Sequence, residues 1–134
     1  MSNITQVVNT DKNLKTLKKG VHASDLDQLL SSQGPFTFFA PSDLAFDKLK
    51  KGMMDDLLEP QNKIKLTDLL NNHIVNGKIN FTELKDGDNL TTLNGRKLLI
   101  AIADGKVSIG DTEIVANSTK ISNGVIHSTD AVML

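Results

Sequence analysis

Phe36–Leu49 reads FTFFAPSDLAFDKL, and this stretch decides the fold because two structural periods meet inside it. Its first five residues form a short apolar run that is typical of a buried strand. Pro41 lacks a backbone donor and ends the strand. Ser42 is a good N-cap for a following helix, whose positive end favours Asp43. Four of the chain's five phenylalanines lie here and the chain has no Trp or Tyr, so we expect this corner to anchor the core.

The composition indicates one domain without covalent cross-links. The chain has 134 residues and no cysteine, which excludes disulfides, thiol catalysis and cysteine-bound metal. A chain of this length buries about two-thirds of the surface that it exposes when unfolded. We therefore expect a single domain over residues 1–134. The formal net charge of −1 indicates no cationic face broad enough for nucleic acid.

Periodicity predicts helices in the first half of the chain and strands in the second. Residues 1–35 are expected to be helical, with one helix over Asp11–Gly20 that stops at Gly20 and another that begins at a capping box on Ser24. A third helix is expected over residues 62–77 with Ile64 on its apolar face. Short apolar runs between turns then predict strands; these are Ile79–Phe81, Asn89–Leu93, Arg96–Ala103, Lys106–Ile109, Thr112–Ala116 and Val125–Thr129. This order indicates an α+β fold with an antiparallel meander.

The polar residues form no recognisable catalytic or metal-binding motif. The three histidines, His22, His73 and His127, lack the spacing of a zinc site. We interpret His73 and His127 as structural hydrogen-bonding groups. Residues 127–130 contain triad residue types, but adjacent strand residues point to opposite faces and cannot act as base and nucleophile. No phosphate-binding loop or EF-hand occurs, so we expect no catalytic residue, cofactor or metal.

Several surface features have simple interpretations. Two small lysine clusters are interpreted as solvated helix faces; they are Lys15, Lys18, Lys19 and Lys48, Lys50, Lys51. Four N-x-S/T sequons matter only in a glycosylating secretory pathway; they begin at Asn3, Asn80, Asn89 and Asn117. No apolar run is long enough to span a bilayer, and the N-terminus shows no signal peptide.

Three segments together resemble the fasciclin (FAS1) domain family. FTFFAPSDLAF (36–46) resembles its first signature block, LLNNHIVNGKI (69–79) its central Tyr-His segment and ISNGVIHSTDAVML (121–134) its second block. Their order fits one domain over essentially the whole chain, similar to small single-domain prokaryotic members. Asn72 stands where the family often has Tyr, and Thr129 where an aliphatic residue is usual. Ser118-Thr119 replaces an Asp-Ile pair that is associated with integrin binding in some members, so integrin binding is not expected.

The resemblance implies an α+β fold in which an antiparallel β-sandwich or wedge packs against a helical N-terminal half. It also implies that the two signature blocks meet in space. The signature positions are Phe39, Ala40, Pro41, Ser42, Asp43, Phe46, His73, Asn123, Gly124, His127 and Asp130. We hypothesise that Pro41, Asp43, His73 and His127 form a polar lock near the core, in which Asp43 caps its own helix or accepts from a histidine. Any binding surface is then expected on more exposed loops or helices.

The resemblance implies a non-enzymatic adhesion or extracellular protein-interaction module, either secreted or located at the cell surface or periplasm. Its partner would be a protein or a surface glycan, with no nucleic acid and no membrane span. A cytoplasmic accessory subunit of a protein complex is the alternative, which the absence of an upstream leader would support. A hydrolase that uses a histidine and a carboxylate also stays open, and a deep pocket with two titratable groups in contact would support it.

Overall fold

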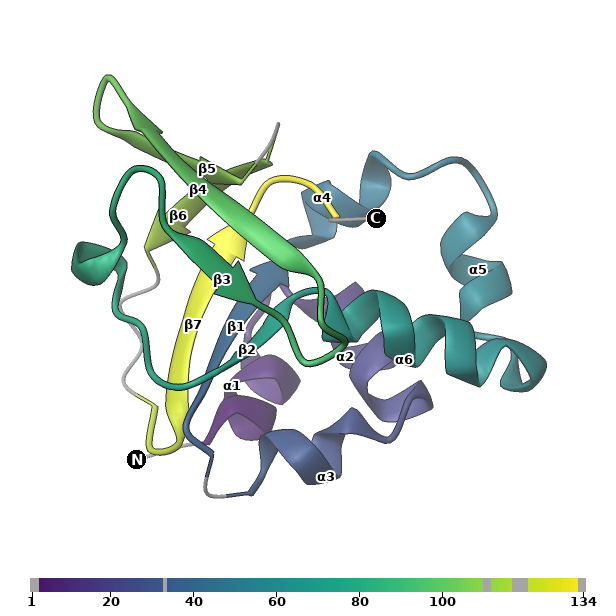
Figure 1. Ribbon diagram of the computed structural model, residues 1–134. Helices are drawn as coiled ribbons and strands as arrows, with labels where there is room; N and C mark the ends of the chain where they lie inside the picture. Colours follow the sequence, from purple (N-terminus) through teal and green to yellow (C-terminus); the bar gives the residue numbers. More distant parts are fainter. Residues whose placement is uncertain (1–2, 33, 110–111, 117–120, 133–134) are drawn as a thin grey trace.

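Figure 1 shows the computed structural model, which describes residues 3–32, 34–109, 112–116 and 121–132. The helices are α1 (Ile4–Thr10), α2 (Lys15–Ala23), α3 (Leu26–Leu30), α4 (Asp43–Asp47), α5 (Met53–Leu57), α6 (Lys63–Asn71) and the short 3-10 helices η1 (Pro60–Asn62) and η2 (Phe81–Glu83). The strands are β1 (Phe36–Pro41), β2 (Ile74–Asn76), β3 (Asn89–Thr91), β4 (Lys97–Ala103), β5 (Lys106–Ile109), β6 (Thr112–Ala116) and β7 (Gly124–Thr129). The predicted α+β fold is confirmed.

The seven strands form one curled sheet in the order β2-β1-β7-β6-β5-β4-β3. Strands β3 to β7 form the predicted antiparallel meander. β1 and β7 pair in parallel, which is possible because a long connection separates them in the chain. The two edges of the sheet then meet, since Val75 of β2 forms a bridge to Thr92 just after β3. The sheet therefore nearly closes into a barrel.

β1 separates two hydrophobic cores because both of its faces are buried. Phe36, Phe38 and Ala40 face a core formed with the helices, whereas Phe39 belongs to a second core inside the curled sheet. This division follows from the two-residue period of a strand. Figure 1 shows the α-helices gathered on one side of β1 and β7, with the β4–β5 hairpin on the other side. The prediction that this stretch anchors the core is confirmed.

The helical character of the first 30 residues was predicted, but the boundaries were wrong. α2 runs through Gly20 to Ala23 because Gly20 serves helix packing: a Cβ at this position would lie 3.3 Å from the Met54 Cε atom. Ser24 is not an N-cap, since its Oγ donates back to the Gly20 carbonyl at 2.8 Å. α3 begins instead after Asp25, which adopts a left-handed conformation.

The helix predicted over residues 62–77 ends at Asn71, and Ile74 lies in strand β2 opposite Phe38. The backbone N–H of His73 donates to the Leu70 carbonyl at 2.9 Å, which satisfies a carbonyl at the end of the helix. The prediction that Ile64 faces the core was also wrong, because its side chain is 79% exposed.

The strand predicted over Ile79–Phe81 does not form. The backbone N–H of Ile79 donates to the Thr37 Oγ1 atom at 2.9 Å, and Phe81 begins η2. The Ile79 N–H therefore bonds to the Thr37 hydroxyl of β1 and not to the backbone of a neighbouring strand. The Asn117 sequon and the Ser118-Thr119 pair lie outside the described residues.

Candidate functional site

Asn123 lies at the junction where the two signature blocks begin. Its side chain is buried, with an exposed fraction of 6%. The Nδ2 group donates to the carbonyls of Leu30 and Ser32 at 2.7 Å each, and the Oδ1 atom accepts from the Ile4 N–H at 2.9 Å. The backbone carbonyl of Asn123 accepts from the Phe36 N–H at 3.0 Å. This one residue therefore connects α1, the end of α3, β1 and β7.

A surface hollow of about 410 Å³ lies at the opposite ends of β1 and β7. Its walls come from the start of α4, the end of β7, strand β6 and the loop before α2. Its lining residues include Asp11, Ser42, Asp43, Leu44, Val115 and Asp130. Both signature blocks thus contribute to one hollow, which sequence reasoning did not predict.

The polar groups of Ser42 and Asp43 hold the walls of this hollow together. The Ser42 Oγ atom accepts from the Ala45 N–H at 3.3 Å, which confirms the predicted N-cap of α4. The Asp43 Oδ1 atom accepts from the Thr16 N–H at 2.9 Å, in the first turn of α2. Asp43 therefore caps a neighbouring helix, whereas the lock hypothesis gave it its own helix or a histidine as partner.

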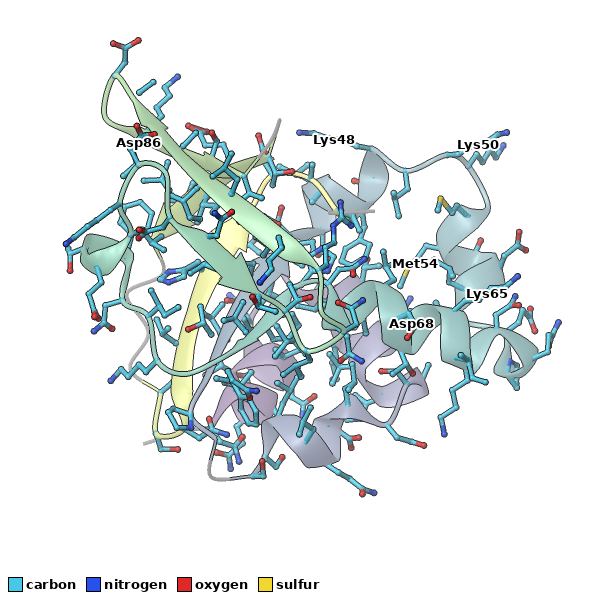
Figure 2. All side chains as sticks on the ribbon, in the orientation of Figure 1. Lys48, Lys50, Met54, Lys65, Asp68 and Asp86 are labelled. Atoms are coloured by element: carbon cyan, nitrogen blue, oxygen red, sulfur yellow. The ribbon has the colours of Figure 1, made fainter. Side chains whose placement is uncertain are left out.

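Asp130 bonds across the strands at the other wall. Its Oδ1 atom accepts from the Glu113 N–H at 2.9 Å, and its Oδ2 atom lies 3.8 Å from the Lys48 Nζ atom. Figure 2 shows Lys48 extending from the end of α4. Both Asp43 and Asp130 thus use a carboxylate oxygen to fix backbone segments.

Two large apolar side chains remain exposed beside these polar walls. Leu44 is 74% exposed and Val115 is 54% exposed, and both line the hollow. Among the described residues, the other large exposed apolar side chains are Ile64 and Leu99, which do not line it. An exposed apolar pair in a concave site with bonded polar walls favours contact with another molecule.

His127 is buried inside the fold rather than beside the hollow. Its ring lies between those of Phe39 and Phe81, at centroid distances of 5.6 and 5.9 Å. The Nε2 atom lies 2.8 Å from the Ile79 carbonyl and must carry the proton, because a carbonyl only accepts. The Nδ1 atom has no hydrogen-bond partner within the described chain. Burial lowers the pKa of His127, and the hydrogen bond to the Ile79 carbonyl raises it by a smaller amount.

His73 follows α6 and is fully buried. Its Nδ1 atom lies 2.8 Å from the Leu69 carbonyl, to which it donates. Burial lowers the pKa of His73 from 6.5 to about 4, opposed by the Leu69 carbonyl and assisted by the charge of Arg96. The ring is therefore neutral at pH 7 and acts as a donor that holds the end of the helix.

Asp43, His73 and His127 bind three different backbone segments, at Thr16, Leu69 and Ile79. These bonds do not join the three side chains into one lock. Among the other signature residues, Phe39, Ala40 and Phe46 are buried in the cores, and Pro41 lies opposite Thr129 at the end of the parallel pair. The structural role of the signature positions stays a prediction that only substitution can test.

The buried His73 makes stability depend on pH. Below about pH 6.5 the unfolded chain binds a proton at this residue, whereas the folded chain does not until about pH 4. The free energy of unfolding should therefore fall by about 3 kcal/mol from this group as the pH decreases through that interval. Urea unfolding at a series of pH values measures the slope.

Two variants make this pH experiment specific. His73→Gln should lose this part of the pH dependence, although its stability at pH 7 is itself reduced by the substitution. His22→Gln is the matched control, because it removes an exposed imidazole and leaves the buried contact of His73 with the Leu69 carbonyl intact, so the part of the slope assigned to His73 should remain. An unchanged slope in His73→Gln would contradict the assignment.

The described part of the chain contains no cluster of three side chains suited to binding a metal ion. Within the same ranges, no helix has both the length and the apolar character that crossing a membrane requires. The candidate site is therefore the hollow itself, with its exposed apolar side chains and bonded polar walls. The two buried histidines lie outside it.

Comparison with known proteins agrees with this geometry. The sequence model for the fasciclin domain matches residues 12–134, and the chain therefore belongs to the fasciclin family. It is 39% identical to protein sll1483 of Synechocystis sp., covering 98% of this chain and 72% of that protein. It is 33% identical to the transforming growth factor-beta-induced protein ig-h3 of Sus scrofa, covering 99% of this chain but 19% of that protein.

The fold also matches a solved structure, that of a FAS1 domain pair from the insect cell adhesion molecule Fasciclin I. The TM-score is 0.85 at 16% identity, with 99% of this chain and 51% of that chain covered. The family includes adhesion and extracellular matrix proteins and is generally non-enzymatic.

Proposed function

We propose that this chain is a non-enzymatic adhesion module, secreted or located at the cell surface, and that the hollow beside α4 docks a protein partner. The observation that carries the proposal is the exposure of Leu44 and Val115 in a hollow built from both signature blocks. The description of the insect structure as a cell adhesion molecule supports the same class of function. A cytoplasmic accessory subunit is the alternative, which the binding experiment below distinguishes from the adhesion role.

The chemistry of the hollow suits docking better than catalysis. Asp43 and Asp130 each use an oxygen to accept from a backbone N–H, and neither of these bonds involves a histidine. The ring of His127 contacts two phenylalanines and a backbone carbonyl inside the fold. The contact of two titratable groups that a histidine–carboxylate hydrolase needs is not among these interactions.

Burial of Leu44 and Val115 supplies the affinity in this proposal. Each apolar side chain contributes about 1.5–3 kcal/mol when a partner removes it fully from water. The polar walls already have protein partners, so docking does not leave these bonded groups unsatisfied. A partner with an apolar protrusion therefore fits the hollow.

Replacing both exposed apolar residues should weaken partner binding without unfolding the protein. The purified chain is immobilised, and retention of protein from the envelope and cytosolic fractions of the source cells is measured. Leu44→Ser with Val115→Ser should reduce retention from the envelope at least about 100-fold, because the two side chains that the partner buries together supply about 3 kcal/mol or more. Both side chains are exposed in the free protein, so the melting temperature should change little.

The matched control is Ile64→Ser with Leu99→Ser, which removes similar exposed side chains outside the hollow. This pair should retain envelope proteins as the parent does. Equal losses in both pairs would contradict the docking site. Retention of cytosolic proteins alone would contradict the adhesion role and support the accessory subunit.

A further inference from the structure

A second hollow, of about 640 Å³, lies between the end of α1 and the exposed face of α2. Its lining residues include Lys12, Lys15, Lys18, Lys19 and His22. The last four are spaced i, i+3, i+4 and i+7, which places them on one face of the helix. Leu17, Gly20 and Val21 are buried on the opposite face. The protein thus concentrates four of its 15 cationic side chains on one concave surface.

The four lysines of this surface have no anionic partner among the described residues. Across the described part of the chain, the ion pairs are His22–Asp27, Lys48–Asp130 and Lys63–Asp25, and none of them includes a lysine of this hollow. Asp11 also lines the hollow and offsets one of the four positive charges, with its Oδ1 atom accepting from the Asn13 N–H at 2.8 Å. The positive charge is therefore local and largely uncompensated, although the whole chain has a formal net charge of −1.

We propose that this lysine-lined hollow binds an acidic polysaccharide, a linear chain of sugars that carry carboxylate or sulfate groups. The row from Lys15 to His22 is roughly 10 Å long at 1.5 Å per helical residue, which suits a linear polymer better than a single anion. All of its fixed cations are lysines, which act as point charges and do not impose the planar geometry of arginine.

The remaining lining groups favour a sugar acid over other polyanions. The Asn9 Oδ1 atom lies 2.7 Å from the His22 Nε2 atom, and the hollow also contains Thr10 and Asp11. The Thr10 hydroxyl and the second carboxylate oxygen of Asp11 are left to accept hydrogen bonds from sugar hydroxyl groups, which a lipid phosphate or an acidic peptide does not supply in comparable number. No aromatic side chain lines the hollow, whereas single-stranded nucleic acids are held by stacking on aromatic rings.

This site is separate from the proposed docking site for a protein. The two hollows share Asp11, but Leu44 and Val115 do not line the basic one. The two sets of variants therefore test different surfaces. Loss of polysaccharide binding with normal retention of envelope protein would separate the two functions experimentally.

Titration calorimetry of the whole chain with polygalacturonate tests the proposal, with dextran as the neutral polymer and oligo-dT as a different polyanion. The triple variant Lys15→Gln, Lys18→Gln, Lys19→Gln should bind polygalacturonate at least about 10-fold more weakly at low salt. The corresponding Lys→Arg triple should bind within about 2-fold of the parent, because it keeps the charge. Affinity of the parent should fall as salt is raised.

The matched control neutralises the other lysine cluster, with Lys48→Gln, Lys50→Gln and Lys51→Gln. Figure 2 shows Lys48 and Lys50 extending from the connection between α4 and α5. This control makes the same change in net charge and should bind polygalacturonate within about 2-fold of the parent. Equal losses in both triple variants, no binding by the parent, or tighter binding of oligo-dT than of polygalacturonate would overturn the proposal.

Discussion

Replacing Gly124 by alanine should destabilise the protein by more than about 3 kcal/mol, a large effect for a single methyl group. A Cβ at this position would lie 2.0 Å from the Phe36 carbonyl oxygen and 2.9 Å from the Phe36 backbone nitrogen. Both atoms belong to the backbone of β1, so no side-chain rotation relieves the clash. The parallel pair of β1 and β7 must separate at its first residue, where Phe36 lies opposite Gly124.

Gly95→Ala is the matched control for this prediction. Gly95 has a φ of +85°, but an added Cβ meets no atom within 4 Å. Only backbone strain opposes this substitution, and we expect a loss of about 1 kcal/mol. Urea unfolding monitored by circular dichroism gives both free energies. A Gly124→Ala variant as stable as Gly95→Ala would show that β1 and β7 tolerate separation at this end.

Replacing Asn123 by alanine should cost about 3–5 kcal/mol, the second large effect. The substitution removes three side-chain hydrogen bonds at once and leaves the Ile4 N–H and the carbonyls of Leu30 and Ser32 without this partner. Asn123→Asp should be destabilised similarly at pH 7. The carboxylate keeps the acceptor for Ile4, but it places an anionic oxygen against two carbonyl oxygens.

The matched control is Asn94→Ala. The Asn94 Nδ2 group donates to the Asp68 carbonyl at 3.1 Å and to the Asn72 Oδ1 atom, and its Oδ1 atom accepts from the Thr92 hydroxyl, but the side chain is exposed. Water can replace these bonds at an exposed side chain, so we expect a loss of less than about 1 kcal/mol. Thermal unfolding distinguishes the two variants. A small loss at Asn123 would mean that α1 and α3 are held mainly by their apolar contacts.

The opening stretch shows how far sequence reasoning reached in the fold. The buried strand over Phe36–Ala40 and the N-cap at Ser42 were predicted correctly, because each depends on neighbours within a few residues. The turn between the strands predicted over Arg96–Ala103 and Lys106–Ile109 was also correct, with Ala103 opposite Lys106 across it. Gly20 was misread as a stop because its packing against α6 depends on residues far along the chain.

The candidate site was less accessible to prediction. The signature residues were identified through the family resemblance, but Asp43 was given the wrong partner. Leu44 and Val115 were not predicted to be exposed. Leu44 lies in the first turn of a capped helix, and Val115 lies in an apolar strand segment of the kind that is usually buried. The lysines of α2 were identified as a cluster and interpreted only as a solvated face. Their arrangement around a hollow was not visible in the spacing.

The sequence by itself determined the elements whose causes are local: the strand and capped helix around Phe36–Phe46, the helical first half and the hairpins of the second. The tertiary structure alone decided how β1 pairs with β7 and where Asp43 and Asn123 bond. The Asp43 bond spans 27 residues and the Asn123–Ile4 bond spans 119. Periodicity and capping act over a few residues, whereas partners at such separations meet only after the sheet has curled around its core.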